Sequence, residues 1–187
     1  MSIRKTIKQI GFTLVELVLF IAIMGIAVAG VLIAYDHAAR DSADPVVKKQ
    51  ALAIAESLLE EIQQMPFTFC DPDDPAVSTA ASAAGCATPE AMGPEAGETR
   101  YNASTPFDNV NDYNGFNTAT DALPGIRQID GTLIAGLGGY SAAVTVAQVA
   151  LGVIAASDSL RITVTVTGPA SVTVTLDGYR TQYAPNL

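Results

Sequence analysis

The chain has 187 residues, 49 % of them hydrophobic, and a formal net charge of −9, so it is long enough for one folded domain and an extension. An acidic chain has no general electrostatic attraction for nucleic acid, and we expect no nucleic-acid partner. The few cations near the start (Arg4, Lys5 and Lys8) leave the remainder more acidic still.

An apolar run covers residues 12–35 and contains a single charged residue, Glu16. At about 1.5 Å per residue this run forms a helix of roughly 36 Å, which exceeds the hydrocarbon core of about 30 Å. The run is about twice as long as the apolar part of a secretory signal, and no A-x-A cleavage site follows it. The sequence therefore predicts a transmembrane helix over residues 12–35.

Charges on the two sides of this run differ. The basic residues precede it, and a mixed set follows it: Asp36, His37, Arg40, Asp41 and Asp44. Because positive charge is retained on the cytoplasmic side, we expect a single-pass protein of the inner membrane, in contact with its lipid. The N-terminus would be cytoplasmic and the C-terminal domain periplasmic.

An amphipathic helix is predicted next, over residues 46–65. Pro45 should kink or break a continuous helix near Asp44, and Pro66 should end the second segment. Apolar residues recur at helical spacing between the two prolines: Val47, Ala51, Ile54, Leu58, Ile62 and Met65. Such a stripe is typical of a helix that packs on a sheet.

Residues 66–124 are loop-like, and their only cysteines, Cys70 and Cys86, lie 16 positions apart. A disulfide is the expected state in an oxidising compartment, and closing a loop of this size contributes about 3 kcal/mol. A zinc site is the alternative, but His37 is the only histidine. We expect the disulfide and the aromatic residues to hold this long irregular segment in place.

Two polar clusters in this segment offer oxygen ligands of the kind that calcium prefers. The first holds Asp71, Asp73 and Asp74; the second holds Asp108, Asn111, Asp112 and Asn114. Neither has EF-hand spacing, and Asp and Asn are also common in ordinary turns. We interpret both clusters as turns, with calcium as the alternative, and expect no required cofactor or metal.

The C-terminal third alternates apolar and polar residues over 160–166 and again over 172–176, with Gly168-Pro169 between them. This pattern predicts an antiparallel hairpin with one buried face. Residues 140–146 should add an earlier strand, and Asp177-Gly178 should turn or bulge the chain into residues 179–183. A long helix on an antiparallel sheet gives an α+β fold.

The start of the chain resembles the class III signal of type IV pilins and type II secretion pseudopilins. A basic leader, Gly11 and the stretch Phe12-Thr13-Leu14-Val15-Glu16-Leu17 carry this resemblance. It implies that prepilin peptidase cleaves after Gly11 and methylates the amine of Phe12. It also implies that Glu16 neutralises the terminal amine of a neighbouring subunit during assembly. The fold would be pilin-like, with the C-terminal half of the long helix packed on the sheet.

Three parts of the chain follow from this resemblance: a leader peptide (residues 1–11), a helix (residues 12–65) and a β-rich domain (residues 66–187). Later segments are similar to MshD-type minor pilins of the mannose-sensitive haemagglutinin (MSHA) pilus system, among them residues 43–62 and 108–115. The implied partners are other pilin subunits and the inner-membrane assembly platform. A minor pseudopilin of a type II secretion system shares the same start and is an alternative.

A membrane-anchored periplasmic binding or adhesion module is an alternative of another class. It predicts an uncleaved Met1 terminus and tolerance of Glu16→Ala. We expect no enzymatic activity, because the sequence has no nucleophile elbow and its single histidine follows the predicted membrane span directly.

Overall fold

The computed structural model describes residues 11–183 and residue 186, apart from the side chains of residues 39–44. The predicted leader lies outside the described residues except for Gly11, as do its three cations. The chain divides into two compact units, Met1–Asp44 and Pro45–Leu187. One long helix, α1 (Leu14–Gln64), contributes residues to both units.

In the first unit, the large apolar side chains of α1 that the structure describes are exposed. The segment Leu14–Ala38 is long and apolar enough to cross a membrane, and none of it is buried. Leu14 and Ile26, for example, are 79 % and 76 % exposed. Exposed apolar area of this extent is unfavourable in water, so this surface requires lipid or another protein to cover it.

Pro45 lies inside α1, because the helix continues through it to Gln64. The sequence predicted a kink or a break near Asp44. The break is wrong, because the helix is continuous, and the kink stays a prediction. A proline within a helix removes one backbone hydrogen bond and costs about 3 kcal/mol. The C-terminal end of the helix agrees with the prediction, since α1 ends at Gln64, two residues before Pro66.

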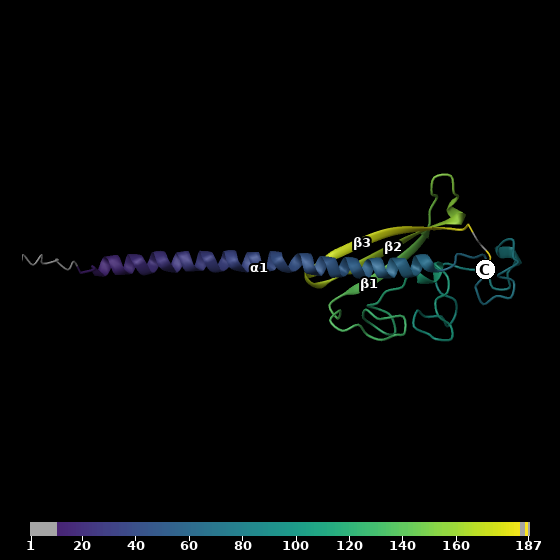
Figure 1. Cartoon of the computed structure of the whole chain (residues 1–187), viewed down its shortest axis with the longest axis horizontal. Helices are drawn as coiled ribbons and strands as arrows, with labels where there is room; N and C mark the ends of the chain where they lie inside the picture. Colours follow the sequence, from purple (N-terminus) through teal and green to yellow (C-terminus); the bar gives the residue numbers. More distant parts are fainter. Residues whose placement is uncertain (1–10, 184–185, 187) are drawn as a thin grey trace, which may run out of the picture. The chain divides into compact units, whose positions relative to one another are not determined.

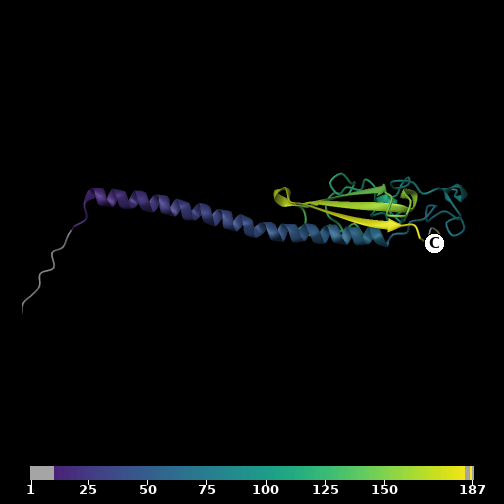
Figure 2. The ribbon, with the colours of Figure 1, turned by 90° about the horizontal axis from the view of Figure 1, so that it is seen from above.

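In the second unit, the part of α1 from Pro45 onward lies against one face of a three-stranded sheet (Figure 1). The view from above shows the helix and the sheet as two layers (Figure 2). The predicted stripe is confirmed, since Ala51, Leu58 and Ile62 are buried and Val47, Ile54 and Met65 are partly buried against the same core. Together with the antiparallel sheet, this gives the predicted α+β layout.

The sheet has the order β1-β2-β3, and both pairs are antiparallel. The strands are β1 (Ser141–Gln148), β2 (Ser159–Thr167) and β3 (Thr173–Thr181). The predicted alternation is clearest on β2, where Leu160, Ile162, Val164 and Val166 are all fully buried. The threonines between them lie on the other face, and a hydrogen bond joins Thr165 to Thr175 of β3. The predicted hairpin and the earlier strand are confirmed.

The sequence predicted a turn or bulge at Asp177-Gly178, and this prediction is wrong. Strand β3 continues through Gly178 and pairs it with Ile162. The glycine instead allows α1 to lie close to the sheet. A Cβ atom at this position would lie 2.8 Å from Leu59 Cδ1 and 2.5 Å from Gln63 Nε2. Glycine inside a strand often marks such a close approach.

Residues 66–140 contain no α-helix or strand of the sheet, only short 3-10 helices and isolated bridges. Part of this segment covers the free edge of β1. Val144 donates its N–H to the Phe116 carbonyl at 2.8 Å, and Thr118 donates to the Ala142 carbonyl at 2.9 Å. Covering an edge strand in this way removes a row of unpaired backbone groups.

An ion pair fixes the same segment to α1. Arg100 donates from Nε and Nη2 to the two carboxylate oxygens of Glu61, each at 2.6 Å. Tyr113 donates its hydroxyl to Glu61 at 2.8 Å, and the Arg100 guanidinium lies over the rings of Tyr101 and Phe116. Burial opposes the charged form of Arg100, but the hydrogen bonds and charge of Glu61 outweigh it and raise the Arg100 pKa.

We predict that Gly178→Val destabilises the second unit by about 1–3 kcal/mol, because the new side chain overlaps Leu59 and Gln63. Thermal unfolding of the full chain in detergent, followed by circular dichroism, measures the effect. Thr175→Val is the control, since it adds the same side chain on the exposed face of β3. A melting temperature equal to that of the control would contradict the close packing.

We predict that Arg100→Met costs about 3 kcal/mol, because it leaves the Glu61 carboxylate without its cation in a largely buried place. Replacing both residues, as in Arg100→Met with Glu61→Met, should restore part of the loss. Arg161→Met, on the exposed face of β2, is the matched control and should change the melting temperature little. Equal effects of the two arginine variants would mean that the ion pair contributes nothing.

Candidate functional site

The predicted processing site lies at the exposed start of α1. Gly11, Phe12 and Thr13 are non-helical and exposed, with Phe12 84 % exposed, and the helix begins at Leu14. A peptidase could therefore reach the backbone between Gly11 and Phe12 without unfolding any described helix. The structure places both predicted cleavage residues together in this short segment.

Thr13 caps α1, and the sequence reasoning missed this. Its Oγ1 accepts a hydrogen bond from the Glu16 N–H at 3.3 Å, and its carbonyl accepts from the Leu17 N–H at 3.2 Å. The spacing Thr-x-x-Glu is the sequence signature of a capping box, which could have identified the helix start.

Glu16 lies in the first turn of α1 and is exposed. A carboxylate at this position interacts favourably with the positive end of the helix dipole. The structure thus gives Glu16 a local role in addition to the assembly role that the resemblance implies. The two roles can be separated, because replacing Thr13 removes the capping hydrogen bond and keeps the Glu16 carboxylate.

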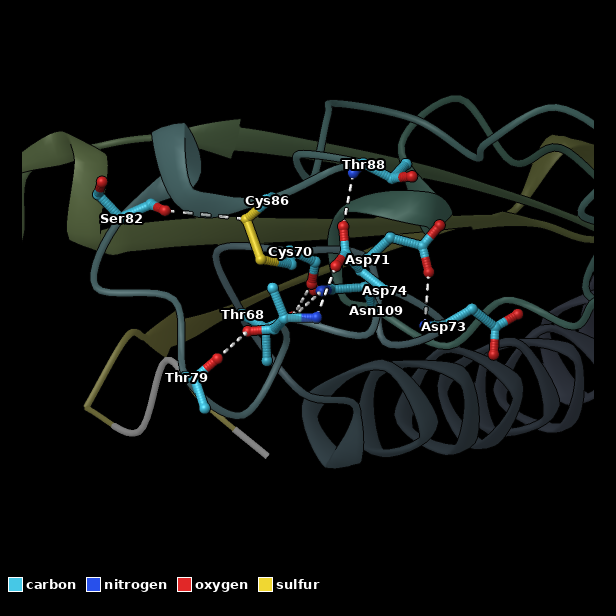
Figure 3. The surroundings of a disulfide bond; sticks show 11 residues. Thr68, Cys70, Asp71, Asp73, Asp74, Thr79, Ser82, Cys86, Thr88 and Asn109 are labelled. Carbon is cyan, nitrogen blue, oxygen red and sulfur yellow. Dashed lines mark hydrogen bonds between the residues drawn. A yellow bond between two sulfur atoms is a disulfide. The ribbon is translucent and has the colours of Figure 1, made fainter.

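The predicted disulfide between Cys70 and Cys86 is present, with the two Cα atoms 5.4 Å apart (Figure 3). Next to it, Asn109 donates to Thr68 Oγ1 at 2.8 Å, and Thr68 donates to the Cys70 carbonyl at 2.6 Å. Backbone hydrogen bonds from Asp71 to Thr88 and from Glu90 to Phe69 continue the contact. The disulfide therefore holds the segment that carries Glu90 beside the end of α1.

The two predicted polar clusters are partly brought together. Asp71, Asp73 and Asp108 place carboxylate oxygens within 4.8 Å of one another, so the first cluster contacts the second. Asp74 does not join them, because its carboxylate accepts hydrogen bonds from the Thr88 and Ala76 backbones, which lower its pKa. The side-chain oxygen of Asn114 accepts a hydrogen bond from the Val146 N–H of β1, so this residue connects the loop to the sheet.

Three glutamates that the sequence reasoning overlooked complete the group. Glu95 and Glu98 form a second triad with Asp71, and Glu90 and Glu95 form a third with Asp112, by the same 4.8 Å criterion. We call these seven residues the acidic cluster: Asp71, Asp73, Glu90, Glu95, Glu98, Asp108 and Asp112. Residues 90–98 contain three glutamates, two glycines and one proline but no cation, and this composition could have identified the group.

Asp112 is the most buried member of the acidic cluster and is 0 % exposed. Its Oδ2 accepts hydrogen bonds from the backbone N–H groups of Asp108 at 2.9 Å and Asn109 at 2.7 Å. Its Oδ1 has no hydrogen-bond partner, and neither carboxylate oxygen of Glu90 has one. Buried carboxylate oxygens without a partner are costly.

The carboxyl groups of the cluster are harder to ionise than usual. Burial, followed by the charge of Asp112, raises the pKa of Glu90 to about 9, although the nearby Asn111 amide opposes the rise. Burial raises the pKa of Asp112 to about 7, against the two backbone N–H groups. Burial and neighbouring carboxylates also raise the pKa of Glu98 to about 7 and that of Asp108 to about 6.

No protein-family model matches the chain, and neither a curated protein nor a solved structure matches it. The assignment of function therefore depends on the residues and geometry described above.

We predict that, in the presence of a chelator, the melting temperature of the chain falls as the pH rises from about 5 to 9. A carboxyl group whose pKa is higher in the folded chain than in the unfolded chain stabilises the fold most at a pH below its unfolded pKa of about 4. This contribution is lost as the pH rises through the pKa of the folded chain, which is about 7 for Asp112 and about 9 for Glu90. Glu90→Gln should reduce the slope, whereas Glu60→Gln, on an exposed helix position, should not. Equal slopes in all three proteins would contradict the raised pKa values.

Proposed function

We propose that the chain is a structural subunit of a type IV pilus or a related filament, most similar to an MSHA-type minor pilin. The observation that carries the proposal is the Gly11-Phe12 junction, followed by an apolar helix with Glu16 in its first turn and none of its segment Leu14–Ala38 buried among the described residues. In this proposal, prepilin peptidase removes residues 1–11 and methylates Phe12. The apolar helix then stays in the product, as a filament subunit requires.

The exposed surface of Leu14–Ala38 supports two successive environments for this segment. Before assembly, lipid of the inner membrane would cover it, with the N-terminus cytoplasmic and the folded domain periplasmic. In the filament, the same segments of neighbouring subunits would cover one another. The transfer between these environments would be made by the inner-membrane assembly platform.

Glu16 would set the position of each subunit in the filament. After cleavage, Phe12 carries a free amine, and its positive charge would pair with Glu16 of a neighbouring subunit. In a medium of low dielectric such a pair attracts strongly, whereas a single buried carboxylate is heavily penalised. A subunit that is out of register would leave this carboxylate unpaired, so correct register would be favoured.

Two alternatives remain as proposals. A minor pseudopilin of a type II secretion system would have the same processing and the same helix, and would differ in the filament that it joins. A membrane-anchored binding module is favoured by a different observation, the acidic cluster on the irregular segment. That alternative needs neither cleavage after Gly11 nor Glu16, so the N-terminus separates it from a filament subunit.

We predict that Glu16→Ala leaves membrane insertion and cleavage intact but lowers incorporation into sheared filaments by roughly tenfold or more, because the incoming subunit then has no carboxylate to pair with the terminal amine of its neighbour. Immunoblots of the membrane and sheared fractions measure this in cells that carry the variant in place of the wild-type gene. Thr13→Ala is the matched control, since it removes the cap and keeps the carboxylate. A similar loss in Thr13→Ala would assign the effect to capping, and normal incorporation of Glu16→Ala would exclude the registration role.

Intact-mass and N-terminal peptide analysis of the same fractions distinguishes the classes of protein. A chain that starts at N-methyl-Phe12 in the filament fraction supports the filament subunit. A chain that still starts at Met1 and stays in the membrane would contradict it and favour the anchored module.

A further inference from the structure

The third triad of the acidic cluster combines three separate parts of the irregular segment. Glu90 follows the disulfide, Glu95 lies in the next turn, and Asp112 belongs to the 3-10 helix η2 (Asn111–Tyr113). One carboxylate oxygen from each lies within 4.8 Å of the others. Two oxygens that bind one calcium ion lie at most about twice the Ca–O distance of roughly 2.4 Å apart, so this spacing suits a shared ion.

Unpartnered buried oxygens are the second observation, independent of the clustering. Asp112 is fully buried, and its Oδ2 is held by two backbone N–H groups while its Oδ1 has no partner. Both oxygens of Glu90 and the Oδ1 of the buried Asn111 also lack one. Two backbone bonds fix the Asp112 carboxylate in place and leave one oxygen available, which is how a ligand carboxylate is commonly oriented.

We propose that Glu90, Glu95 and Asp112 bind a calcium ion that joins the segment after the disulfide to η2. The ion would supply the positive charge that these oxygens lack. The site is independent of the proposed filament function, because every residue in it belongs to the second unit.

The donor set selects calcium among the common metal ions. All three proposed ligands bind through oxygen, whereas zinc prefers nitrogen and sulfur ligands. Both cysteines are in the disulfide, so they offer no thiolate to a metal ion. Magnesium requires a near-ideal octahedron and keeps several waters, whereas calcium accepts six to eight oxygens in irregular geometry. An irregular segment with several carboxylates, some of them able to bind through both oxygens, suits calcium better.

Protonation is the competing way to relieve the repulsion among these carboxylates. A proton on Glu90 at neutral pH would neutralise one charge without any metal, consistent with its raised pKa. The two explanations differ in one variant. Glu90→Gln imitates the protonated carboxyl, so without calcium it should melt at or above the wild-type temperature at pH 8. The same variant loses a ligand, so it should gain little from calcium.

The test uses the full chain in detergent at pH 7.5, freed of divalent ions with a chelator and then titrated with calcium chloride. We expect saturable binding by calorimetry, with half-saturation at roughly 10⁻⁵–10⁻³ M, and a rise in melting temperature over the same range. Asp112→Asn and Glu90→Gln should lower the affinity at least tenfold, and Glu60→Gln, which removes one charge elsewhere, should not. Magnesium chloride should require a much higher concentration.

Three results would overturn the proposal. The first is no calcium-dependent heat or melting shift in the wild-type chain. The second is an undiminished response in both Glu90→Gln and Asp112→Asn. The third is equal half-saturation with magnesium, which would show nonspecific attraction to an acidic surface. If Asp112→Asn does not fold, Glu95→Gln replaces it, because Glu95 is only half-buried.

Discussion

The ion pair between Arg100 and Glu61 is the constraint on which the second unit depends. Residues 66–140 contain no α-helix or strand of the sheet, and besides their backbone hydrogen bonds to β1 they are fixed to α1 by side chains. Arg100 is 7 % exposed, binds both oxygens of Glu61, donates to the Arg127 carbonyl and lies over two aromatic rings. A single guanidinium thus connects α1, the aromatic residues and two distant parts of the loop. Its planar group and five donors suit this role, which lysine could not fill.

The second unit contains carboxylates that are paired with a cation and carboxylates that are not. Glu61 has a cation and a tyrosine hydroxyl as partners. Glu90 and Asp112, in contrast, are largely removed from water and lie near other carboxylates. Because burial strengthens electrostatic interactions, it increases the attraction in the first arrangement and the repulsion in the second. The disulfide keeps Glu90 close to the cluster despite this repulsion, since it fixes the segment covalently beside the end of α1. A bound cation would turn the repulsion into a further link between these loops.

Periodic parts of the chain could be predicted from the sequence, and contacts between distant parts could not. The helical stripe from Val47 to Met65 and the alternation on β2 each follow from a repeat of a few residues, and both are confirmed. Gly178 was misread as part of a turn or bulge, because a glycine in a strand can mark a turn, a bulge or a close approach. Which one applies depends on Leu59 and Gln63, far away in the sequence. The Arg100–Glu61 pair and the gathering of Glu90, Glu95 and Asp112 depend on such contacts in the same way.

The two units of the chain differ in what stabilises them. The second unit has its own core, a disulfide and a buried ion pair, so contacts within the chain contribute to its stability. Leu14–Ala38 has apolar side chains on all sides and no buried residue, so its surroundings determine its stability. In the proposed filament subunit, this difference allows the two units to respond separately to a change of surroundings. The apolar helix could leave lipid and enter a filament without disturbing the folded domain, because the core residues that the structure describes all lie at Val47 or later.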